Sequence, residues 1–213
     1  MSRVNHELKS CFIHIPKVAG CSLSNSEWNR GNGHKTIADF EVELGMEALT
    51  SFFKWSFVRN PWERIVSAYE DCPEIWSQVP TFRDFINCIY DHRTQLDGIM
   101  ALRFTNCPWL GLPVGRLHFM PQHLLMRNRI GEYHMDFVGR YESLQEDFDK
   151  VQDKLGVKRR TLPHHNQRAN KKGRRKTAAW RELYDAELVY KVGKIYAEDA
   201  AIFQYFAPRA IGG

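Results

Sequence analysis

The stretch CFIHIPKVAGCSL, residues 11–23, decides the fold of this chain. Its first five residues are mostly apolar and rich in β-formers, which predicts a buried strand that ends at Pro16. A turn with Lys17 and Gly20 follows, and we expect a helix from Ser22 onward. A strand, a glycine-containing turn and a helix start are together typical of a phosphate cradle. There, backbone N–H groups, the helix N-terminus and a lysine face an anion.

The order of lysine and glycine in this turn differs from that of a Walker A loop. In a Walker A loop the lysine follows the last glycine, whereas Lys17 precedes Gly20 by three positions. From these residues alone, an ordinary βα turn with a surface lysine remains an alternative interpretation.

Length and composition predict one globular domain over residues 1–213. The chain has 213 residues, of which 43% are hydrophobic, enough for one sizeable core. Its net charge of +5 suits an anionic ligand, whether a nucleotide, a nucleic acid or an acidic glycan, and does not choose among them.

The five cysteines are scattered, odd in number and without a CxxC pair. This pattern favours reduced thiols in a cytosol-like compartment over a disulfide framework or a zinc site. The first ten residues are polar and lack the apolar core of a signal peptide. No apolar run approaches the length of a membrane span. We therefore expect a cytoplasmic or otherwise soluble protein without a signal peptide or transmembrane segment.

Strand and helix patterns alternate along the chain. Further strands are expected at residues 52–58 and around 137–138, and residues 93–116 have no clear periodicity. The expected helices cover 37–49 with a break at Gly45, the stretch after Pro61, 81–90, 121–129, 144–155 and 185–206. This alternation predicts an α/β class, a three-layer P-loop-like fold whose central, mostly parallel sheet is flanked by helices.

A second motif, FVRNPWERIVSAY, covers residues 57–69. Arg59 stands at the carboxyl end of the expected strand, where ligands bind in open α/β sheets. Ser67 follows eight positions later, on the next helix. An arginine fork and a hydroxyl can grip a phosphate monoester through charge-assisted hydrogen bonds. The alternative is a structural arginine that pairs with Glu63 or Glu70.

Together, the two motifs resemble those of PAPS-dependent sulfotransferases, in particular the carbohydrate (type 2) sulfotransferase family. Residues 16–22 resemble the 5′-phosphosulfate loop, and Arg59 with Ser67 resembles the 3′-phosphate site. The resemblance implies PAPS as cosubstrate with PAP as product, and no metal. It also implies transfer of the sulfuryl group to a hydroxyl of an acceptor, which we expect to be a saccharide and not a nucleic acid.

The resemblance also assigns the nucleotide-binding residues. Residues 137–148 resemble the strand and helix that follow the acceptor region, and 171–173 the basic-basic-glycine loop over the 3′-phosphate. At Cys21 the family more commonly has Thr or Ser, so a loop hydroxyl is lost while backbone donors remain. The implied cofactor-binding residues are Lys17, Val18, Ala19, Gly20, Cys21, Ser22, Arg59, Ser67, Tyr141, Lys171, Lys172 and Gly173.

Sulfuryl transfer needs a positive charge on the departing phosphate and a base for the acceptor hydroxyl. Lys17 is expected to supply the charge. We expect His34 to be the base, because a histidine suits proton removal near neutrality and its position resembles the catalytic histidine of heparan sulfate 2-O- and 6-O-sulfotransferases. His118 is the alternative base. With Gln122 it forms an HxxPQ pattern that we interpret as acceptor-side or structural, and His14 is expected to be a core histidine.

Three interpretations of the basic stretch over residues 168–176 remain: a solvated loop, a nucleic-acid patch, or a nucleotide lid, which we favour. Two other functional classes also remain open. A P-loop kinase would need a Walker A lysine and a strand-end aspartate, and neither is evident in the sequence. A non-catalytic nucleotide- or glycan-binding module would keep the fold without the transfer reaction. Oligomeric state is not indicated.

Overall fold

The computed structural model describes residues 3–23, 34–71, 79, 81–91, 117–162 and 179–209. Two compact units divide the chain, and each takes two stretches of it. Unit 1 comprises Met1–Arg59 and Gln122–Gln167, and unit 2 comprises Asn60–Pro121 and Arg168–Gly213. The single-domain organisation stays a prediction. The excursion expected over 93–116 and the basic stretch over 168–176 lie outside the described residues.

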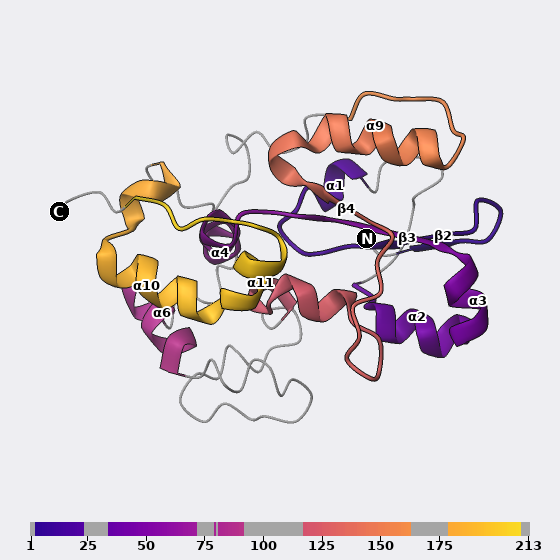
Figure 1. Ribbon diagram of the computed structural model, residues 1–213. Coiled ribbons are helices and arrows are strands. Elements are labelled where there is room, and N and C mark those ends of the chain that lie inside the picture. Colours follow the sequence, from indigo (N-terminus) through magenta and orange to yellow (C-terminus); the bar gives the residue numbers. More distant parts are fainter. Residues whose placement is uncertain are drawn as a thin grey trace. The chain divides into compact units, whose positions relative to one another are not determined.

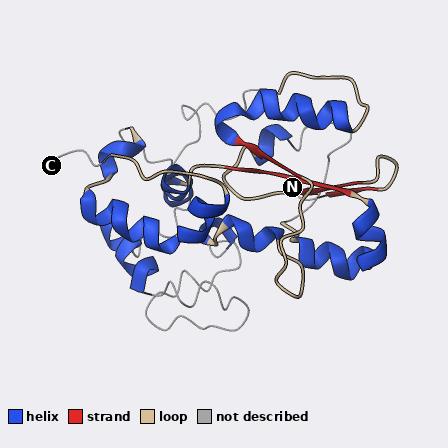
Figure 2. Cartoon of the chain, viewed as in Figure 1, coloured by secondary structure: helices blue, strands red, loops and turns tan. Residues whose placement is uncertain are grey.

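Unit 1 contains a four-stranded sheet in the order β1-β2-β3-β4. Figure 2 shows its strands in red. The strands are β1 (Arg3–Asn5), β2 (Ser10–Ile13), β3 (Phe53–Val58) and β4 (Phe137–Arg140). β2, β3 and β4 are parallel, and only β1 runs antiparallel to its neighbour. The predicted α/β class with a mostly parallel sheet is confirmed, and β1 is a strand that the sequence pattern did not indicate.

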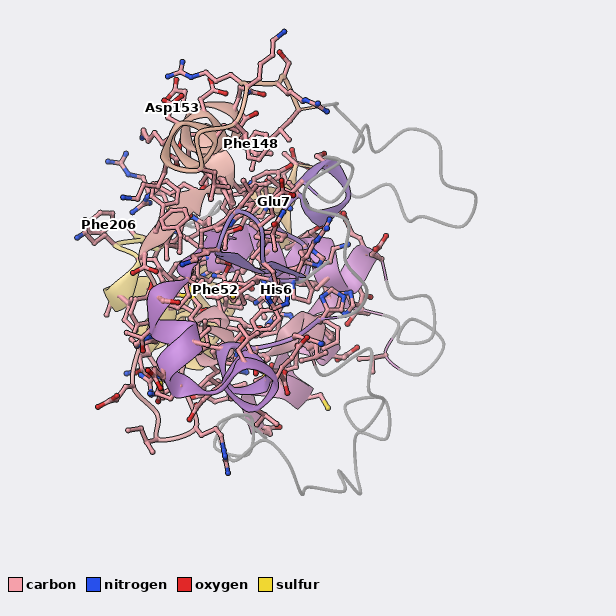
Figure 3. The ribbon with its side chains drawn as sticks, turned by 90° about the vertical axis from the view of Figure 1, so that its right-hand side faces the viewer. His6, Glu7, Phe52, Phe148, Asp153 and Phe206 are labelled. Atoms are coloured by element: carbon pink, nitrogen blue, oxygen red, sulfur yellow. The ribbon has the colours of Figure 1, made fainter. Side chains whose placement is uncertain are left out.

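Helices cover both faces of this sheet (Figure 1). Those on one face are α1 (Gly20–Leu23) and α9 (Leu144–Lys154), and those on the other are α2 (Ile37–Leu44) and α3 (Met46–Ser51). Phe148 lies on the inner side of α9 and is buried, while the exposed Asp153 lies on its outer side (Figure 3). The sheet of unit 1 is therefore flanked by helices, as predicted.

Close packing explains the glycine in β4. A Cβ on Gly139 would lie 2.5 Å from the Phe57 ring and 2.9 Å from Cβ of Asp147. The missing side chain lets α9 approach the strand. Asp147 then accepts hydrogen bonds from the Arg140 N–H and the Ser143 hydroxyl, both at 2.8 Å. These bonds fix the chain where β4 ends.

Local capping explains where two of the predicted helices begin and end. Thr36 and Asp39 form a capping box at the start of α2. Gly45, with a φ of 79°, separates α2 from α3, which confirms the break predicted there. Asn60 caps α4 (Pro61–Glu70) by accepting from the N–H groups of residues 62 and 63, and Pro61 takes the first helical position as predicted.

Unit 2 is helical in its described part, with an aromatic core. Besides α4 it contains α6 (Phe82–Asp91), η5 (Trp180–Leu183), α10 (Ala186–Ile195) and α11 (Ala197–Ile202). The rings of Phe85 and Phe119 meet edge to face at 5.0 Å, and Tyr69 packs on Phe85 at 4.9 Å. Arg64, 1% exposed, donates to the Met120 carbonyl at 3.0 Å and so fixes the segment before unit 1 resumes.

The single helix predicted over 185–206 is wrong, because the chain forms α10 and α11 with a break at Tyr196. Tyr196 has non-helical backbone angles at this break, and its buried hydroxyl donates to the Phe119 carbonyl at 2.6 Å. A tertiary hydrogen bond therefore holds the residue at which the helical pattern is interrupted.

The expectation of reduced cysteines holds at Cys11 and is wrong at Cys88. Cys11 is a free, buried thiol on β2, and burial raises its pKa to about 12. Cys88, on α6, is disulfide-bonded. Disulfides persist in oxidising compartments, so the cysteines no longer support a cytoplasmic location. In the described part of the chain, no helix has both the length and the apolar character to cross a membrane.

Candidate active site

Three neighbouring parallel strands of unit 1 deliver predicted site residues to one edge of the sheet. The turn with Lys17 follows β2, Arg59 follows β3, and Tyr141 follows β4. The register pairs Ile13 with Ser56 and Val58 with Arg140, so the carboxyl ends of these strands lie together. This is the edge at which ligands bind in open α/β sheets.

The turn after β2 has a backbone shape that suits an anion. Lys17 and Ala19 have φ values of 69° and 51°, in the left-handed region that costs a non-glycine residue about 1–3 kcal/mol. Ser22 and Leu23 donate their N–H groups to the Ala19 carbonyl and close the first turn of α1. Within the described residues, neither the Val18 nor the Ala19 N–H donates a hydrogen bond. Turns of this kind form anion-binding nests of backbone donors.

Arg59 reaches from β3 onto this turn. Its Nη1 donates to the Lys17 carbonyl at 3.1 Å, and the Tyr141 ring lies 4.2 Å from its Cζ. Arg59 is 6% exposed, so this cation is held in a largely dehydrated position. The structure therefore brings together residues from all three strand ends. Lys17 was predicted for the phosphosulfate loop and Arg59 for the 3′-phosphate site.

Gln122 holds the backbone of Arg59. It is the first residue of η3 (Gln122–Met126) and is fully buried. Its Oε1 accepts from the Arg59 N–H, and its Nε2 donates to the Arg59 carbonyl, both at 3.0 Å. The sequence allowed either an acceptor-side or a structural role for Gln122. These contacts are structural.

His34, the predicted base, lies against His14. The two imidazoles stack with centroids 4.6 Å apart, and Nδ1 of His34 is 3.4 Å from the His14 carbonyl. The His14 ring also lies on Gly20, because a Cβ there would be 1.6 Å from Nε2 of His14. One buried ring therefore separates the predicted base from the phosphosulfate loop. The expectation that His14 is a buried histidine is confirmed.

Burial lowers the pKa of His34 below its ordinary value, and the positive N-terminus acts in the same direction. The contact with the His14 carbonyl raises the pKa but does not outweigh burial. His34 is therefore neutral at pH 7. If its Nδ1–H donates to that carbonyl, its Nε2 carries the lone pair that a general base needs.

Comparison with protein-family models matches residues 21–206 to the sulfotransferase family. The chain belongs to this family. Comparisons with curated proteins and with solved structures gave no match. The family transfers sulfuryl groups, so the resemblance to sulfotransferases that the sequence motifs indicated is confirmed. The match begins after Gly20, so the assignment of Lys17 depends on the sequence motif and on the geometry of the turn.

The structure describes only some of the remaining predicted residues of this sulfotransferase. Ser67 is a partly exposed residue of α4 in unit 2, and the partly exposed His118 belongs to a helical stretch of the same unit. Lys171, Lys172 and Gly173 lie outside the described residues, and the side chain of Cys21 is not described. Ser22 is 5% exposed. In the part of the chain that the structure describes, no cluster of three or more metal-binding side chains occurs.

Sequence reasoning missed two contacts of the sulfotransferase site. The grip of Gln122 on Arg59 joins residues 63 positions apart, and no local pattern indicates it. The position of His14 could have been found from strand periodicity. Phe12 and His14 are two positions apart and therefore share a face, and their rings stack at 6.1 Å.

Proposed function

We propose that this chain is a PAPS-dependent sulfotransferase that moves a sulfuryl group to a hydroxyl of a carbohydrate or glycoconjugate. The observation that carries the proposal is the position of Arg59. Its buried guanidinium lies between the Lys17 carbonyl and the Tyr141 ring. It is beside the turn whose Val18 and Ala19 amides donate to no acceptor among the described residues. A dehydrated cation beside a nest of backbone donors suits a ligand with several anionic groups.

The residues present fit such a nucleotide. Lys17 and the backbone of residues 18–22 would hold the 5′-phosphosulfate, and Arg59 would hold the 3′-phosphate with Tyr141 beside it. For Ser67 and residues 171–173, the proposed nucleotide-binding role rests on the sequence motifs alone. When bound, PAPS supplies the activated sulfuryl group. The Lys17 ammonium stabilises negative charge at the 5′-phosphate end of the site.

His34 acts as the general base in this proposal. Its lowered pKa keeps the imidazole neutral near pH 7, mainly because the ring is buried. With Nδ1–H directed at the His14 carbonyl, Nε2 takes the proton of the acceptor hydroxyl. His118, in unit 2, remains the alternative base, and it retains a proposed acceptor-side role.

The acceptor class and the location rest on other observations. A saccharide acceptor follows from the resemblance to carbohydrate sulfotransferases. The disulfide at Cys88 favours an oxidising compartment over the cytoplasm. Protein cations take the place of a metal in this proposal, so we expect EDTA to leave transfer intact. Loss of transfer with EDTA and its recovery with magnesium would favour the kinase alternative.

The test is a thermal shift with PAP. A ligand that binds only the folded state stabilises it by about 2.7 kcal/mol at a hundredfold excess over Kd, so the Tm should rise clearly. Arg59→Ala should remove most of this rise. Arg159→Ala is the matched control, because Arg159 is an exposed arginine of unit 1 that pairs with Asp153. A Tm that does not respond to saturating PAP contradicts the cofactor assignment.

A second step separates the functional classes. Radiolabelled PAPS is incubated with sugars, glycolipids and polysaccharides, and label transfer is followed. Transfer to a saccharide supports the proposal. A response of the Tm to ATP and magnesium in place of PAP would favour the kinase, and PAP binding without transfer to any acceptor would favour the binding module.

A further inference from the structure

The Gln122 amide replaces a strand partner at the end of β3. Regular pairing between β3 and β4 ends at Val58 and Arg140. The next residue, Arg59, exchanges both of its backbone hydrogen bonds with Gln122, donating to Oε1 and accepting from Nε2 at 3.0 Å each. Within an antiparallel sheet, two residues exchange bonds in the same way. One fully buried side chain therefore extends the fixed backbone by one residue beyond the strand.

These two hydrogen bonds fix the backbone position from which the Arg59 side chain extends. Two bonds to the same residue fix its position and its rotation about the strand direction. The guanidinium then reaches the Lys17 carbonyl at 3.1 Å. Lys17 has a left-handed backbone, a conformation that lasts only where its surroundings hold it. The contacts form a chain from Gln122 through Arg59 to the phosphosulfate loop, all within unit 1.

We propose that Gln122 is a positioning residue for the phosphosulfate loop. By gripping the Arg59 backbone, it keeps the guanidinium on the Lys17 carbonyl and holds residues 17–20 in shape before any nucleotide arrives. The consequence for donor binding rests on the proposed function. The effect on the loop itself does not rest on that function, because every contact between Gln122, Arg59 and Lys17 is made within the protein.

Unit 1 provides a matched control in Gln152. This residue of α9 is also fully buried. Its Oε1 accepts from the Arg160 N–H at 2.7 Å, and its Nε2 is 3.5 Å from the Arg160 carbonyl and donates to Asp149 at 3.1 Å. It grips an arginine backbone with the same side chain but belongs to the segment around α9, away from the chain of contacts that leads to Lys17.

The experiment compares Gln122→Met with Gln152→Met by amide hydrogen exchange in the nucleotide-free protein. Methionine keeps the length of glutamine and removes both hydrogen bonds. We expect exchange of the Ser22 and Leu23 amides, which close on Ala19, to accelerate roughly tenfold in Gln122→Met and to stay unchanged in Gln152→Met. Equal acceleration in both variants, or none in Gln122→Met, would overturn the proposal.

A kinetic measurement adds a readout that general destabilisation does not move. Gln122→Met should raise the KM for PAPS and the Kd for PAP roughly tenfold and leave the acceptor KM unchanged, whereas Gln152→Met should change none of them. If the wild-type protein does not bind PAP, the proposed function fails while the exchange comparison still decides the role of Gln122. If Gln122→Met does not fold, the same exchange comparison between Gln122→Glu and Gln152→Glu decides it.

Discussion

The two units bury different kinds of side chain. Unit 1 buries many polar groups, and several of them form the candidate site. Among these are His14 and Arg59 at the ends of parallel strands and Gln122 at the start of η3. In the described part of unit 2, the only buried charged side chains are Arg64, Glu70 and Asp199, and its core is a cluster of aromatic and aliphatic residues.

This difference has an energetic meaning. Burial of a polar group lowers the stability of the fold unless hydrogen bonds satisfy that group. In unit 1, groups that carry this cost form the candidate site. Burial of aromatic rings such as Phe85 stabilises the folded state without that cost. We therefore expect substitutions at the buried site of unit 1 to impair activity more than folding, and substitutions in the core of unit 2 to impair folding first.

The largest expected effect on activity belongs to His34 and Lys17. His34→Ala should lower kcat by about 10²–10⁴-fold with nearly unchanged PAP affinity, because it removes only the proposed base. Lys17→Ala should lower kcat and also weaken binding of the donor, because the proposed function assigns its ammonium to the phosphosulfate. Steady-state kinetics and PAP titration separate the two variants.

His118→Ala is the discriminating variant for the base. If it loses turnover while His34→Ala keeps it, the base is His118 and the acceptor-side interpretation of the HxxPQ pattern gains support. If both variants keep near-normal turnover, neither histidine is the base, even where PAP binding supports the cofactor.

In unit 2 we expect the largest effect on stability at Phe85. It is fully buried and packs against Tyr69, Phe82 and Phe119. Phe85→Ala should lower the free energy of unfolding by about 3–5 kcal/mol, as measured by urea denaturation. Phe206→Ala is the matched control, because Phe206 is 85% exposed. A similar loss in both variants would contradict the assignment of the unit 2 core.

A smaller effect is expected from the contact between Gly20 and His14. A Cβ at Gly20 would overlap the His14 ring, at 1.6 Å from Nε2. Gly20→Ala should therefore displace the loop and raise the KM for PAPS by roughly tenfold, in line with the cost of overpacking. Adding His14→Ala should restore donor binding, because the small side chain makes room.

The double variant should not recover kcat, since His34 loses the ring on which it stacks. Isothermal titration with PAP reports the recovery of binding, and single-turnover kinetics reports the rate. A double variant that binds PAP no better than Gly20→Ala alone would show that the loop is displaced by something other than His14.

Local chemistry accounts for what the sequence predicted well. The turn between β2 and α1, the break at Gly45 and the start of α4 at Pro61 each depend on a few adjacent residues with strong backbone preferences. The order of strand ends along the chain was enough to place Lys17 and Arg59 at one edge of the sheet.

The features that the sequence did not predict depend on partners far along the chain. β1 is a short polar segment that is a strand because it pairs with β2. The break at Tyr196 is held by a bond to the Phe119 carbonyl, and Gln122 finds its partner at Arg59. Each depends on tertiary packing, which a periodicity of 2 or 3.6 residues does not encode.

The smallest expected effect is a shift in the pH profile, and it tests whether burial in unit 1 tunes the base. Burial lowers the pKa of His34, and the hydrogen bond to the His14 carbonyl opposes that shift without outweighing it. Only the neutral imidazole accepts a proton, so kcat/KM should rise with pH through this pKa. The midpoint should therefore fall below about 6.5, the ordinary value for histidine.

The lowered pKa of His34 also makes the stability of the folded state depend on pH. Because the folded state binds the His34 proton less readily than the unfolded state, the contribution of His34 to stability is complete above the ordinary pKa. It is then lost as the pH falls from that value through the lowered one. His14→Ala exposes the His34 ring to water, so the pKa of His34 and the kinetic midpoint should move upward together. NMR titration of the His34 ring and the kcat/KM profile measure the two independently. A midpoint that stays in place while the His34 resonance shifts would show that the titrating group of the reaction is not His34, and that the polar burial of unit 1 serves the loop alone.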